Sequence, residues 1–147
     1  MRDGAPIDLI AFVLGLAAAV PIGAVFLRAA VALYNNIAGG ATSSSMVPEP
    51  AFGKAMVISF VWHLPGLVIS FVVSLVVSLV SAPAMLMILF PVNLLVNLLI
   101  MAAILSAMLP TTFGRAILVT LCYIVIGVLF VGGLLLIGGV LITVALR

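Results

Sequence analysis

Two long stretches of this sequence carry no charged side chain, and they limit the possible folds more than any other feature. Residues 55–114 form a run of 60 without Asp, Glu, Lys or Arg, and residues 116–146 form a second run of 31. A helix needs about 20 apolar residues, at about 1.5 Å each, to cross the hydrocarbon core of a bilayer. The first stretch therefore predicts two membrane crossings and the second predicts one.

The composition excludes a water-soluble fold. Hydrophobic residues make up 67% of the 147 residues and charged residues only 5%, whereas soluble domains carry about 25% charged residues. Soluble enzymes, nucleic-acid-binding proteins and disordered tails are thereby excluded. Alternation along the chain is also too weak for an outer-membrane barrel, whose strands alternate over about 10 residues. The net charge of +2 does not indicate nucleic acid, since cations at helix ends commonly anchor at lipid headgroups.

The predicted fold is an all-α integral membrane protein, a single transmembrane domain spanning residues 1–147. A fourth crossing precedes the charge-free stretches, over residues 9–27. The four helices are expected at about residues 7–32, 52–80, 84–109 and 112–146, with a polar loop over residues 35–51. The short turn Ser81-Ala82-Pro83 makes the second and third helices a central antiparallel hairpin.

The first helix is expected to stay uncleaved. Its start carries Asp3 and Asp8 against a single Arg2, which is unlike the basic start of a signal peptide. The single cysteine, Cys122, lies inside an apolar run and cannot form a disulfide within the chain.

A weak internal repeat relates two of the predicted helix starts. Residues 52–59 read FGKAMVIS and residues 113–120 read FGRAILVT, so the substitutions keep size and charge. If the segments are related, both helices enter the membrane from the same side, which requires an even number of crossings between them. The predicted hairpin supplies two, and we interpret the repeat as a duplicated helical hairpin with an incomplete second copy.

The basic residues give an orientation. Arg28, Lys54 and Arg115 fall on one predicted side, and Arg2 and Arg147 fall on the other with both termini. The positive-inside rule places the first group in the cytoplasm, with the termini outside, in the cell (inner) membrane. The first three cations are expected to snorkel to the interface or, alternatively, to contact anionic lipid headgroups.

Small side chains recur at every fourth position on two helices. The first stripe is Ala11, Gly15, Ala19 and Gly23, and the second is Ser70, Ser74 and Ser78. Such spacing lets helices approach closely, which drives their association in lipid. The serine stripe has an alternative interpretation as the lining of a narrow hydrated pore.

Asn93 and Asn97 lie four residues apart on the third predicted helix, and His63 is the only histidine. An amide without a partner in hydrocarbon costs several kcal/mol, so we expect both to hydrogen-bond as polar glue between helices. The alternative is a polar site for a neutral ligand, formed with His63 or the serines. For His63 we favour a hydrogen-bonded structural role over gating or contact with a quinone-like ligand. One histidine without nearby Cys, Asp or Glu predicts no metal or haem cofactor.

The sequence restricts the function only to a class. It contains no Gly-rich phosphate loop and no nucleophile elbow, so we do not expect an enzyme. The expected function is a structural or accessory membrane subunit that packs in the bilayer against other membrane subunits or its own copies. The alternative is a small homo-oligomeric pore or carrier for a neutral or weakly charged solute.

Overall fold

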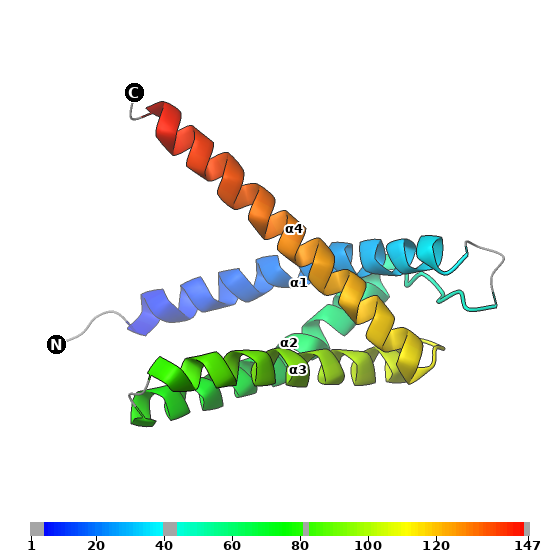
Figure 1. Ribbon diagram of the computed structural model, residues 1–147, viewed down its shortest axis with the longest axis horizontal. Helices are drawn as coiled ribbons and strands as arrows, with labels where there is room; N and C mark the ends of the chain where they lie inside the picture. Colours follow the sequence, from blue (N-terminus) through cyan, green and yellow to red (C-terminus); the bar gives the residue numbers. More distant parts are fainter. Residues whose placement is uncertain (1–4, 40–43, 81–82, 146–147) are drawn as a thin grey trace.

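The chain forms four long helices. The computed structural model describes residues 5–39, 44–80 and 83–145. The helices are α1 (Ala5–Ile37), α2 (Phe52–Val80), α3 (Pro83–Met108) and α4 (Phe113–Ala145) (Figure 1). All four are long and apolar enough to cross a membrane, and no strand occurs in the described ranges. The predicted all-α membrane fold is therefore confirmed, and the chain is a multi-pass integral membrane protein.

Helix α1 ends later than expected. It continues to Ile37 rather than residue 32, so Asn35 and Asn36 belong to the helix and not to the loop. Asparagine usually competes with helical hydrogen bonds through its side chain. At Asn35 this competition is removed, because its side chain bonds the following segment instead.

Parts of the expected hairpin turn and termini lie outside the described residues, namely Ser81, Ala82, Arg2, Asp3 and Arg147. Pro83 occupies the first position of α3, where its missing N–H costs nothing and its fixed φ suits a helix. Each of the first three helices also contains an internal proline without ending there.

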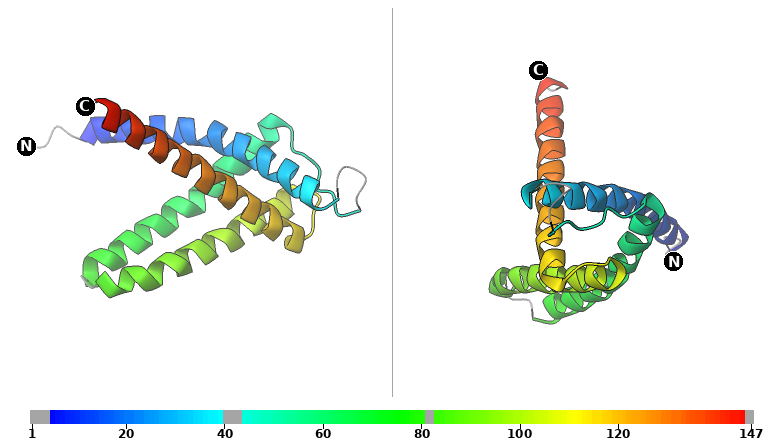
Figure 2. Two further views of the ribbon diagram at one scale, coloured as in Figure 1. Left: turned by 45° about the horizontal axis from the view of Figure 1, so that its top comes forward. Right: turned by 90° about the vertical axis from the view of Figure 1, so that its right-hand side faces the viewer.

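The helices converge at one end of the molecule and diverge at the other (Figures 1 and 2). The end of α1, the starts of α2 and α4 and the end of α3 meet at the converging end, which we call the packed end. Each helix contributes a nearly fully buried side chain there: Leu27, Ile58, Leu105 and Val119. Helices α1 and α3 each contact both α2 and α4, so the four form a ring of neighbours.

Three arms project from the packed end: the first half of α1, the second half of α4 and the α2–α3 hairpin (Figure 2). Their apolar side chains are mostly exposed, as at Leu14, Phe71 and Leu135. The termini-bearing arms point to the same side as the hairpin turn, which agrees with four crossings.

The internal repeat has a counterpart in the packing. Residues 52–59 and 113–120 open α2 and α4 at the same end of the molecule and share one burial pattern. The equivalent buried pairs are Ala55 and Ala116, Ile58 and Val119, and Ser59 and Thr120. Both segments start with a similar backbone bond, from the alanine N–H to the carbonyl four residues earlier, at 2.9 and 3.0 Å. The prediction that both helices enter from one side is confirmed.

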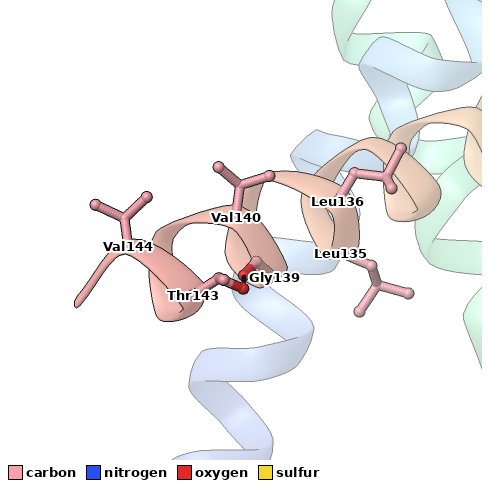
Figure 3. Close-up of a pocket in the computed structure, with 6 residues that line it drawn as sticks. All are labelled: Leu135, Leu136, Gly139, Val140, Thr143 and Val144. Atoms are coloured by element: carbon pink, nitrogen blue, oxygen red, sulfur yellow. Dashed lines mark hydrogen bonds between the residues drawn. The ribbon is translucent and has the colours of Figure 1, made fainter. Parts of the chain in front are cut away.

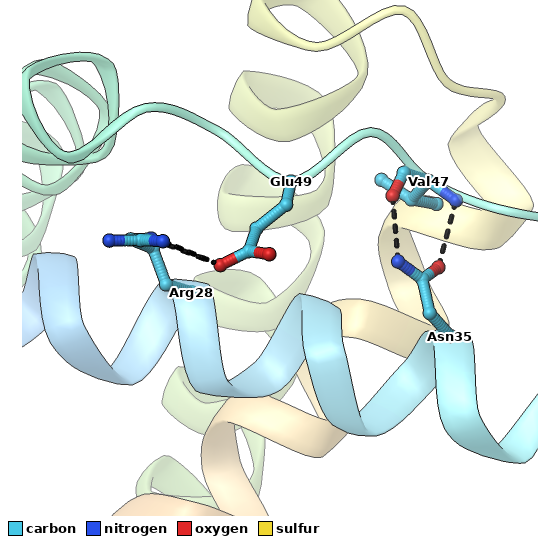
Figure 4. A network of polar contacts seen from close by, with 4 residues as sticks. All are labelled: Arg28, Asn35, Val47 and Glu49. Carbon is cyan, nitrogen blue, oxygen red and sulfur yellow. Dashed lines mark hydrogen bonds and ion pairs between the residues drawn. The ribbon is translucent and has the colours of Figure 1, made fainter. Parts of the chain in front are cut away.

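The segment before α2 lies along the end of α1 (Figure 4). The Asn35 side chain donates to the Val47 carbonyl at 2.8 Å and accepts from the Val47 N–H at 2.9 Å. An ion pair joins Arg28 Nη2 to Glu49 Oε1 at 2.8 Å, with both side chains nearly half exposed. These bonds bring the Val47 side chain into the packed end, where it is fully buried.

Candidate intramembrane polar site

A pocket of about 350 Å³ lies between α2 and α3, where the hairpin leaves the packed end. Four of the predicted polar residues line it together: His63, Ser70, Asn93 and Asn97. The remaining lining residues are Trp62, Gly66 and Leu67. The juxtaposition of the asparagines with the histidine, which the sequence left as one of two alternatives, is the arrangement found in the structure.

Helical spacing explains how α2 presents its share of the site. His63, Gly66 and Ser70 follow at intervals of three and four residues, which places them on one helix face. The face is hollow at Gly66, because a Cβ built there meets only Asn97 Oδ1, at 4.0 Å. The missing side chain therefore leaves room beside the Asn97 amide.

The two asparagines bond each other within α3. Asn97 Nδ2 donates to the Asn93 carbonyl and to Asn93 Oδ1, both at 2.8 Å. Both protons of the Asn97 amide are thereby used within one helix, and this pair is not glue between helices. Within the described part of the chain, Asn97 Oδ1 has no bonded donor and Asn93 Nδ2 has no bonded acceptor.

His63 is held by its own helix. Its Nδ1 lies 2.6 Å from the Ser59 carbonyl oxygen. Because a carbonyl oxygen can only accept, Nδ1 carries the proton, and Nε2 of the neutral ring is an acceptor. The site thus holds two acceptors, His63 Nε2 and Asn97 Oδ1, and one donor group, Asn93 Nδ2.

A closed crevice lies behind the pocket, where α1 crosses α2 and α4. Gly23 packs directly against the Ser59 side chain, and a Cβ at Gly23 would come within 3.4 Å of the Tyr123 hydroxyl. Ser59 Oγ and Trp62 Nε1 are buried there without a bonded partner among the described residues. Trp62 also makes edge contacts with the rings of His63 and Tyr123, at 5.5 and 5.3 Å between centroids.

Trp62 and Asn97 also border a second pocket of about 280 Å³, between α3 and α4. Its walls are mostly aliphatic, and its Thr120 hydroxyl already donates to the Ala116 carbonyl at 2.8 Å. The polar capacity of this region is therefore concentrated on the α2–α3 side.

The rest of the serine stripe lies outside the site. Ser74 and Ser78 are exposed farther along α2, and Ser78 Oγ donates to the Leu75 carbonyl at 2.8 Å. The sequence did not single out the unpartnered Ser59 hydroxyl or the Tyr123 hydroxyl behind the pocket. The available signal was Ser59 standing four residues before His63, but nothing local marks Tyr123.

The stripe on α1 divides between the two regions of the molecule. Gly23 is buried and Ala19 is half-buried, whereas Ala11 and Gly15 are exposed on the arm. A Cβ at Gly15 would meet nothing within 4 Å. Only the last of the four positions therefore supports packing within the chain.

The three predicted headgroup contacts differ in their surroundings. Arg28 pairs with Glu49, Lys54 is exposed at the start of α2, and Arg115 is half-buried at the start of α4. All lie at the packed end, away from the pocket.

Comparison with known proteins adds no relative: no family model, no curated protein and no solved structure matches this chain. Within the described ranges, no group of three His, Cys, Asp or Glu side chains could hold a metal ion.

Proposed function

We propose that this protein is an accessory subunit of a membrane complex, which associates with transmembrane helices of other subunits through its three arms. The observation that carries the proposal is the divergence of the arms from the packed end (Figure 2). Their long apolar faces have no neighbouring helix within the chain, although two of them carry glycines at helix-packing positions.

The arm of α4 supplies the clearest docking feature. Gly139 and Thr143, four residues apart, form a notch between Leu135, Val140 and neighbouring aliphatic side chains (Figure 3). The Thr143 hydroxyl donates to the Gly139 carbonyl at 2.7 Å, so it presents little unsatisfied polarity to lipid. Pairs of small residues at this spacing let a second helix backbone approach closely.

The occupants we propose are helices of a different subunit rather than a second copy. A two-fold dimer uses the same patch on both copies, so one such contact covers one arm and leaves the other two exposed. Described residues of the arms carry no charge from Ile10 to Leu27 or from Ala116 to Val144, so a matching partner face is uncharged and rich in small residues.

The pore alternative has less support from the geometry. Ser74 and Ser78 lie outside the polar pocket on the hairpin arm, and the packed end is closed by Leu27, Ile58 and Leu105. The described polar side chains therefore do not line a continuous path across one chain.

Native mass spectrometry on protein gently extracted from its own membrane tests the proposal. Co-purification of an unrelated membrane subunit is expected, and Gly139→Leu should reduce it by filling the notch. Gly53→Leu is the matched control, because Gly53 also has open space around it but lies at the packed end. A lone monomer, or a closed ring of identical copies, would overturn the proposal.

We further propose that the packed end faces the cytoplasm of a cell (inner) membrane, because Arg28, Lys54 and Arg115 gather there. Fluorescent-protein fusions test this orientation, since a C-terminal fusion to a reporter active only in the cytoplasm should stay dark. A bright fusion would reverse the assignment.

A further inference from the structure

We propose that the pocket between α2 and α3 binds an uncharged lipid whose headgroup carries a free hydroxyl, of the diacylglycerol class. Its volume of about 350 Å³ falls at the lower end of the range of small-molecule sites, about 300–1,000 Å³. Leu67 and Ser70 at its rim are exposed, so the pocket opens on the lipid-facing surface of the hairpin. A lipid headgroup can therefore enter sideways from the bilayer while its chains stay among other lipids.

The hydrogen-bonding groups of the pocket select a hydroxyl. His63 Nε2 and Asn97 Oδ1 accept, and Asn93 Nδ2 donates, after the bonds within the chain are counted. A hydroxyl donates one bond and accepts up to two, so a headgroup hydroxyl can bond one acceptor and the Asn93 amide together. A quinone or an ester carbonyl only accepts, and it would leave both acceptors of the pocket without a donor.

The surroundings select an uncharged headgroup. No Lys, Arg, Asp or Glu lines the pocket. The nearest cation along α2 is Lys54, nine residues before His63, which is about 13 Å of helix rise. A phosphate in this position would lose water without gaining a cation, which makes its burial costly.

The hollow at Gly66 is the place where the headgroup reaches the Asn97 amide. A side chain at this position would occupy the space beside Asn97 Oδ1 without clashing with the backbone of α3, because Oδ1 is its only neighbour within 4 Å. Gly66→Leu should therefore fill the hollow while leaving the helix packing intact.

The chain contains its own reporter, because its single tryptophan, Trp62, lines the pocket. The full chain is placed in phosphatidylcholine nanodiscs with a low mole fraction of dioleoylglycerol carrying brominated chains, which quench tryptophan fluorescence on contact. Quenching is expected to exceed that from the same fraction of brominated phosphatidylcholine. Unlabelled dioleoylglycerol should reverse it, whereas trioleoylglycerol, which lacks a hydroxyl, and dioleoyl phosphatidic acid should not.

Two variants test the residues. Asn93→Leu removes the donor while Asn97 keeps the Asn93 backbone carbonyl as a partner, and Gly66→Leu fills the hollow. Each should weaken the affinity about tenfold, the loss expected for one good hydrogen bond or its space. Ser74→Leu is the control, since it adds the same side chain to α2 outside the pocket.

Three results would overturn the proposal. Equal competition by trioleoylglycerol would mean an apolar groove without hydroxyl recognition, and competition by phosphatidic acid would mean a site that accepts charge. Quenching no greater than that from brominated phosphatidylcholine would mean no site. The competition series uses the unaltered chain alone, so it decides the question even if a variant fails to fold, and independently of any partner subunit.

Discussion

The packed end and the three arms are built from the same kinds of residue, yet they differ in how these residues are used. Leu105 at the packed end is fully buried, whereas Leu135 on the α4 arm is 72% exposed. Gly23 lies against the Ser59 side chain, whereas Gly15, two turns earlier on the same stripe, has nothing within 4 Å of a Cβ position. Burial in this protein therefore depends on whether a neighbouring helix is present and not on local composition.

The comparison teaches how helices associate in lipid. Lipid chains cover an apolar face about as well as another helix does, so helices gain from contact chiefly through close packing and polar bonds. The packed end has both kinds of contact, including the bonds that hold residues 44–51 on α1. The arms have small residues without a second helix, which is why we expect a partner there.

The largest effect that separates the two regions should come from Gly23→Leu. Its side chain has no room beside Ser59 and Tyr123, so α1 must move away from α2, at a cost of about 3 kcal/mol in the free energy of unfolding. Gly15→Leu, in open space, should change it by less than about 0.5 kcal/mol. Unfolding in mixed micelles with SDS measures both, and equal effects would contradict the division into packed end and arms.

Leu105→Ala should have the next largest effect. In lipid the cost of the lost transfer from water is absent, and the packing loss of the cavity remains, about 2 kcal/mol. The same substitution at the exposed Leu135 should leave the free energy of unfolding nearly unchanged in the isolated chain. A similar loss at both positions would show that the α4 arm packs within the chain after all.

Asn35→Ala tests the attachment of the loop to α1. It removes both bonds to the Val47 backbone, a loss of about 1–2 kcal/mol. Hydrogen exchange followed by mass spectrometry should show faster exchange in residues 44–51. Asn36→Ala, at the exposed neighbouring position, is the control, and unchanged exchange in the Asn35 variant would contradict the assigned role.

The smallest effect should come from the ion pair between Arg28 and Glu49. Because both side chains are nearly half exposed, the coupling between Arg28→Gln and Glu49→Gln in a double-mutant cycle should be about 0.5 kcal/mol and should fall with added salt. A coupling well above 1 kcal/mol would mean that the interface around the pair excludes water.

The sequence by itself determined the number of crossings and their sides. Run length between charges is a local property, and the thickness of the bilayer converts it directly into four spans. The repeat of residues 52–59 in residues 113–120 is likewise visible in one dimension, and its shared burial pattern follows because each segment opens a helix at the packed end. The polar character of His63, Asn93 and Asn97 was also evident, since such residues are rare between charge-free runs.

Only the tertiary structure decided which faces meet. All sides of these helices are apolar, so hydropathy does not distinguish a packed face from one that lipid covers. The sequence assigned Ala11, Gly15 and Gly23 to one packing stripe, and only the crossing of α1 over α2 separates Gly23 from the others. Crossing geometry likewise brings His63 and Ser70 of α2 to the asparagines of α3 and leaves Ser74 outside, because the pocket depends on where the two helices approach in space.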